Sequence, residues 1–137
     1  MEPQVPSLAQ ARIVHGALLS GSFAVGVVVW FVTRDGGLGG EPIPVLGDVA
    51  LILAGVMLVA AVSLRALLKN RAARASGPDR ALLCFQAGLV PMAMLEGATL
   101  FQLMVWLLNG EPLPHAAVAG FLWLVGATLW PPSPDDL

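Results

Sequence analysis

The sequence predicts an all-α integral membrane protein with four transmembrane helices. Of its 137 residues, 57% are hydrophobic, and the mean hydropathy is +0.80. Only 12% of the residues are charged, whereas a soluble domain has about 25%. The apolar residues also gather in four segments, each approaching the ~20 residues that a spanning helix needs. These observations favour a multi-pass protein in contact with the lipid bilayer, and nothing in the charge pattern indicates nucleic-acid binding.

The four apolar segments cover residues 13–32, 45–68, 81–108 and 115–130, and the fourth is the shortest. Glycines, prolines and charged residues separate them, as expected of loops. The first segment is too long for the apolar core of a signal peptide, so we expect it to remain as a helix. We therefore predict one domain of two helical hairpins over residues 1–130. A flexible, acidic tail is expected over residues 131–137.

The basic residues predict the orientation. Five of the seven lie at or within the connection between the second and third segments, namely Arg65, Lys69, Arg71, Arg74 and Arg80. The positive-inside rule places this connection and both termini in the cytoplasm, in a cell inner membrane. Trp30 and Trp106 would then mark the outer interface and Trp130 the inner one. Trp123 does not fit this belt, so we expect it to pack between helices.

Glu96 lies near the middle of the third segment, where a charge costs roughly 3 kcal/mol on insertion scales. A carboxyl at that depth stays protonated, pairs, or serves a proton or ion path. Thr99 follows one turn later, and Ser22 lies at a similar depth in the first segment, so both hydroxyls are candidate donors to it. Glu96, Thr99 and Ser22 form the predicted ion-binding set. Pro91 lies about one turn before Glu96 and leaves the carbonyl of Ala87 without its usual helical donor.

Small residues suggest close contacts between helices, and five of them form the predicted oligomer interface: Gly16, Ser20, Gly55, Ala61 and Gly97. Cofactors and metals have no recognisable motif. Cys84 stands alone, and no spacing supports ligation of haem or chlorophyll by His15 or His115.

The central hairpin, residues 51–112, resembles the c subunit of rotary ATP synthases. In that family a small-residue helix leads through a short polar cytoplasmic loop to a helix with one essential acid near mid-membrane. Residues 94–112, MLEGATLFQLMVWLLNGEP, carry the resemblance. It implies a homo-oligomer, ring-like in the family, with Glu96 as the proton-binding acid and Thr99 at a matching threonine. The second segment lacks the family's dense glycine repeat, and the first and fourth segments have no counterpart in a simple c subunit.

Two hypotheses of function follow, and both concern a protein that is not an enzyme, because no nucleophile and base converge. In the first, the chain forms a homo-oligomer in which a buried, protonatable Glu96 takes part in proton translocation or proton-linked assembly. In the second, the chain is a structural subunit of a larger complex with other membrane proteins, and Glu96 anchors helices by a hydrogen bond. A small channel between protomers is a third alternative.

Overall fold

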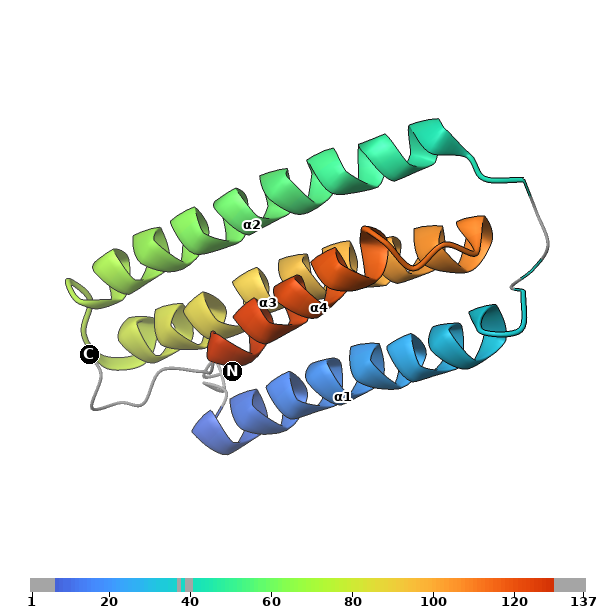
Figure 1. Ribbon diagram of the computed structural model, residues 1–137. Helices are drawn as coiled ribbons and strands as arrows, with labels where there is room; N and C mark the ends of the chain where they lie inside the picture. Colours follow the sequence, from blue (N-terminus) through green and yellow to red (C-terminus); the bar gives the residue numbers. More distant parts are fainter. Residues whose placement is uncertain (1–6, 37, 39–40, 130–137) are drawn as a thin grey trace, which may run out of the picture.

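The computed structural model describes residues 7–36, 38 and 41–129, and these residues form a bundle of four helices (Figure 1). The helices are α1 (Leu8–Thr33), α2 (Pro44–Ala72), α3 (Gly77–Asn109) and α4 (His115–Thr128). Consecutive helices run in opposite directions. The predicted all-α class is confirmed. The predicted acidic tail and the predicted interfacial position of Trp130 lie outside the described residues.

The helix ends follow local sequence signals. Ser7 and Gln10 form a capping box at the start of α1, in which each side chain accepts a hydrogen bond from the backbone N–H of the other. Pro44 occupies the first turn of α2, where its missing N–H costs nothing. At the end of α3, Gly110 adopts a left-handed conformation with φ of 72° and donates its N–H to the carbonyl of Trp106.

The fourth helix is shorter than predicted. Three helices, α1 to α3, are long and apolar enough to cross a membrane, whereas α4 has 14 residues. Its length is about 21 Å, compared with a hydrocarbon core of about 30 Å. The sequence Trp130-Pro131-Pro132 follows it, and a proline disfavours helical backbone in the residue before it. The apolar run therefore extends further than the helix.

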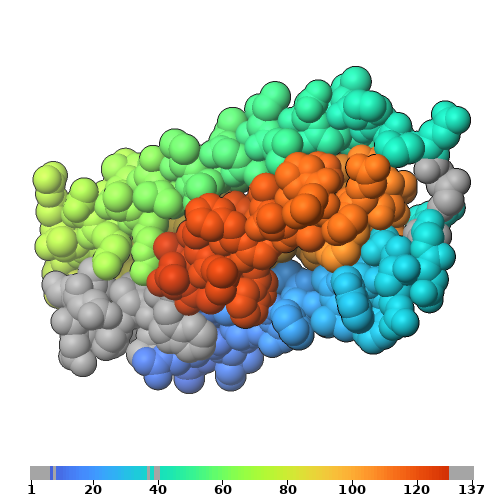
Figure 2. All heavy atoms as spheres, in the orientation of Figure 1, coloured from blue at the N-terminus to red at the C-terminus, as the bar shows by residue number. Residues whose placement is uncertain are grey.

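Helix α3 lies at the centre of the bundle and contacts the other three helices. Helix α4 lies across one face of α3, between α2 and α1, and the space-filling view shows this face (Figure 2). In the described part of the chain α1 does not contact α2, so α1 is held mainly by α3. The main core lies between α2, α3 and α4, where small side chains such as Ala54, Ala61 and Ala98 allow close packing.

Polar and apolar side chains are distributed in the manner expected of a bundle surrounded by lipid. The buried side chains include six polar ones: His15, Ser22, Thr33, Thr99, Gln102 and His115. Large apolar side chains such as Phe23, Val56 and Leu124 are more than half exposed. Since water would penalise that exposed apolar surface, this pattern supports the prediction of a multi-pass membrane protein.

Candidate functional site

Glu96 is only half-buried in the single chain, which differs from the predicted buried carboxyl. It lies two turns before Leu103, and therefore on the same face of α3. Leu103 points toward α1, because a Cβ built on Gly26 would lie 3.8 Å from its methyl groups. Ala93 and Gly97, on the other side of Glu96, are exposed. The Glu96 carboxyl therefore lies at the boundary between the side of α3 that packs against α1 and the exposed side of α3.

The two predicted donors to Glu96 use their hydroxyl protons elsewhere. Thr99 Oγ1 donates to the carbonyl oxygen of Leu95 at 2.9 Å. Ser22 Oγ lies 3.1 Å and 3.2 Å from the carbonyl oxygens of Leu18 and Leu19. Each hydroxyl has one proton, so neither donates to Glu96 while these bonds are formed. Their role as ion ligands stays a prediction.

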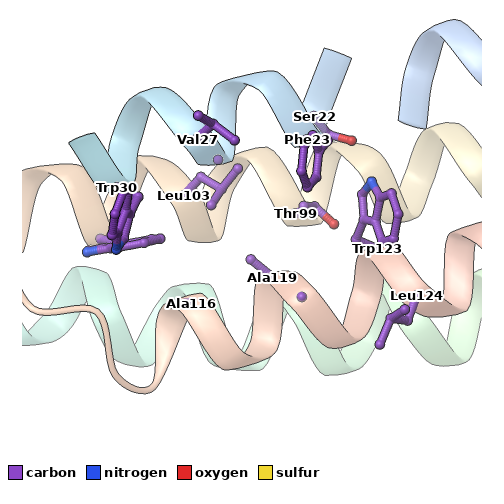
Figure 3. Close-up of a pocket in the computed structure, with 13 residues that line it drawn as sticks. Ser22, Phe23, Val27, Trp30, Thr99, Leu103, Ala116, Ala119, Trp123 and Leu124 are labelled. Carbon is purple, nitrogen blue, oxygen red and sulfur yellow. The ribbon is translucent and has the colours of Figure 1, made fainter. Parts of the chain in front are cut away.

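The structure does bring Ser22 and Thr99 together in another place. Both line a groove of about 410 Å³ between α1 and α4, with α3 as its floor (Figure 3). Aromatic side chains dominate its two ends, with Trp30 at one end and Phe23 and Trp123 at the other. Glu96 is not among the lining residues. The predicted ion-binding set is therefore divided between this groove and the edge of α3.

A buried amide–imidazole pair joins three helices, and sequence analysis did not predict it. Gln102, which is 0% exposed, donates from Nε2 to the carbonyl oxygen of Ala50 in α2 at 2.6 Å. His115 Nδ1 of α4 donates to Gln102 Oε1 at 2.7 Å. Gly47 permits this approach, because a Cβ there would lie 3.3 Å from His115 Nε2. The signal in the sequence was the glutamine within an apolar segment, since a buried amide requires partners.

Arg65, which was predicted to lie at or within the connection between the second and third segments, has a role that the sequence did not predict. It lies within α2, seven residues before the end of that helix, and its side chain reaches into the bundle. Its Nη1 donates to the carbonyl oxygens of Ala87 and Leu129 at 3.2 Å and 3.0 Å. The Ala87 carbonyl is the one that Pro91 deprives of a helical donor, and Leu129 follows the last residue of α4. One guanidinium therefore stabilises two carbonyls that their own helices leave without a donor.

Trp123 packs between helices, as predicted, and also forms a hydrogen bond. Its Nε1 donates to the carbonyl oxygen of Leu19 in α1 at 3.0 Å. Its ring lies 6.0 Å from the ring of Phe23, measured between centroids. Both contacts join α4 to α1, two helices that otherwise touch little.

The five residues of the predicted oligomer interface have different environments. Ser20, Gly55 and Gly97 are exposed, and Gly16 is half-buried. A Cβ added at any of the three glycines would meet nothing within 4 Å, so packing within the chain does not require a glycine there. Ala61, in contrast, is 0% exposed in the core between α2, α3 and α4. The helices of its own chain cover it, so it packs within the chain.

Across the described residues, no three His, Cys, Asp or Glu side chains come together as a metal site. Comparisons of the chain with protein-family models, with curated proteins and with solved structures find no match. The resemblance of the central hairpin to the c subunit therefore stays a prediction from residues 51–112.

Proposed function

We propose that this protein is a membrane subunit that self-associates, and that Glu96 is a protonatable site enclosed where neighbouring chains meet. The observation that supports this most is the half-buried position of Glu96 at the edge of α3. A carboxyl left partly facing hydrocarbon is costly, and a second chain packed against this edge would remove it from lipid.

The surface beside Glu96 suits close approach of another helix. Ala93 and Gly97 are both small and exposed, and they are four residues apart, so they lie on one side of α3. Nothing lies within 4 Å of a Cβ built on Gly97. A helix of a neighbouring chain is therefore free to contact the α3 backbone here, and such contact would bring it next to the carboxyl.

The chemistry proposed for this site is reversible protonation. Hydrocarbon favours the neutral carboxyl, and a polar group supplied by a neighbouring subunit favours the carboxylate. Alternation between the two environments would load and release a proton. The c-subunit resemblance of the α2–α3 hairpin supports translocation as the purpose of this cycle. It also supports a proton over sodium, because the glutamine that sodium-binding members carry in the inner helix is missing from α2.

A second candidate function is favoured by the way this chain uses other polar side chains. Gln102 and Arg65 each donate to a carbonyl on another helix. Glu96 would then serve in the same way between subunits, as a hydrogen-bond anchor of an accessory subunit in a larger complex. In this case the protonated Glu96 carboxyl forms a hydrogen bond to the neighbouring subunit and does not release its proton.

The decisive variant is Glu96→Gln, which keeps shape and hydrogen-bonding capacity but does not titrate. Proton uptake would be measured in proteoliposomes under an imposed potential, and assembly mass in detergent. Under the translocation proposal, Glu96→Gln abolishes uptake and leaves the mass unchanged. Full uptake by this variant would refute translocation. Under the anchor proposal, Glu96→Gln is tolerated, while Glu96→Leu weakens assembly by about 1 kcal/mol.

A carbodiimide that attacks protonated carboxyls gives an independent measure. At neutral pH it should modify Glu96 in preference to Asp35, Glu41 and Glu111, which are exposed outside the helices. Mass spectrometry of peptides would locate the adduct. Equal modification of all four acids would show that Glu96 is ionised and in contact with water, against both proposals.

A further inference from the structure

The groove between α1 and α4 is separate from the edge of α3 that carries Glu96. Its walls are almost wholly apolar, with Val27 and Leu103 between the aromatic ends (Figure 3). Its volume of about 410 Å³ lies within the range of about 300–1,000 Å³ typical of small-molecule sites. In a membrane, lipid is the molecule that reaches such a surface.

The groove is slightly shorter than the hydrocarbon part of one leaflet. Its wall on α1 extends from Trp30 to Ser22, which are eight positions apart, and its floor extends from Trp106 to Thr99, which are seven positions apart. At 1.5 Å per residue these distances are about 12 Å and about 10 Å. Half of the hydrocarbon core measures about 15 Å. If Trp30 and Trp106 lie at the outer interface, as the sequence predicts, the groove runs from that interface at the C-terminal end of α3 toward mid-membrane.

The deep end of the groove is closed by a specific contact. The hydrogen bond from Trp123 Nε1 to the carbonyl of Leu19 joins α4 to α1 at that depth, and the ring of Phe23 packs beside it. A helix of another protein would need to continue past this point to cross the bilayer. A single lipid chain, which ends at mid-membrane, does not.

We propose that this groove binds one acyl chain of a phospholipid from the leaflet at the C-terminal end of α3. A second observation at the outer end supports a lipid with a carbonyl group. Trp106 forms part of the groove wall, and its buried Nε1 has no acceptor among the described residues. A buried N–H without an acceptor is rare, and the ester carbonyl of a phospholipid lies at the depth of this tryptophan.

The test is lipid retention by the full-length protein after detergent extraction, measured by native mass spectrometry with added palmitoyl-oleoyl phosphatidylethanolamine. We expect one tightly retained phospholipid per wild-type chain. Gly26→Leu should abolish retention, because the new side chain enters the groove. Gly21→Leu is the matched control in the same helix, since Gly21 is exposed, does not line the groove, and has open space around a built Cβ.

Trp106→Phe tests the donor, because it keeps an aromatic wall and removes the N–H. Retention should weaken by about two- to tenfold, the value of one hydrogen bond. Phe101→Leu is the control, because it changes an aromatic side chain of the same helix that does not line the groove and should not weaken retention. Equal losses in both variants would overturn the role given to Trp106. Equal retention by Gly26→Leu and Gly21→Leu would overturn the acyl-chain site. A change of oligomeric mass in Gly26→Leu alone would also overturn it, and would assign the groove to a second copy of the chain.

Discussion

The buried pair of Gln102 and His115 gives the sharpest prediction about stability. Gln102→Leu removes two hydrogen bonds, one to the carbonyl of Ala50 and one from His115. Interhelical hydrogen bonds in membrane proteins average about 0.6 kcal/mol, so the two contribute about 1.2 kcal/mol. His115 is only 5% exposed, and its ring N–H would be left without an acceptor, which costs about 1 kcal/mol more. We expect a total loss of about 2 kcal/mol in the free energy of unfolding.

The double-mutant cycle separates the pair from simple packing loss. His115→Leu alone should cost about 1.5 kcal/mol, because it removes one bond and leaves Gln102 Oε1 without a donor. The double variant loses the shared bond only once and leaves no unpaired group from this contact, so it should lose about 2.5 kcal/mol less than the sum of the single variants. Unfolding in mixed micelles, followed by circular dichroism, measures all three. Gln86→Leu is the control, a half-exposed glutamine in the same helix. Additivity within about 0.3 kcal/mol would refute the geometry described for this pair.

Three further predictions concern orientation, Arg65 and assembly. In a background without the native thiol, Ala73→Cys should react only with a reagent added from the cytoplasmic side and Glu111→Cys only with one added from outside; the opposite pattern would reverse the orientation. Arg65→Met should lower stability by about 1–2 kcal/mol and increase hydrogen exchange at the end of α4, because two carbonyls lose their donor; unchanged exchange there would contradict this role. Gly55→Leu and Gly97→Leu should reduce assembly size on native gels without loss of stability, since the single chain leaves space at both sites; unchanged size in both would place self-association elsewhere.

Hydropathy predicted the helices well but not their ends. The predicted segment 45–68 became α2 (Pro44–Ala72), because a helix continues into polar residues beyond the hydrocarbon core and hydropathy does not record that continuation. The last segment was predicted too long for the opposite reason: its apolar residues extend up to two prolines, whereas its helix ends before them. Length and hydropathy therefore predict which segments can lie in the hydrocarbon core, whereas prolines and polar residues at the ends of a segment decide where the helix itself ends.

The polar contacts were less predictable than the helices. Position in a segment gives the depth of Glu96, but its burial depends on which sides of α3 the other helices cover. The released carbonyl at Ala87 was predictable from Pro91. Its donor, Arg65, was not, because the contact depends on how α2 and α3 align along the bundle. Gln102 and Ala50 likewise lie 52 residues apart in the chain, and no local pattern connects them.

The unequal lengths of α2 and α4 have a consequence for the surrounding bilayer. Helix α2 has 29 residues, or about 43 Å, and the helical part of α4 has 14, or about 21 Å. Lipids beside α2 therefore meet an apolar side as long as the core, while those beside α4 meet a shorter one and must thin locally or let the protein tilt. Such hydrophobic mismatch costs fractions of a kcal/mol per Å, and contact between the short sides of two copies would share one thinned region between them. Membrane thickness is thus expected to change the assembly of this protein independently of any specific contact.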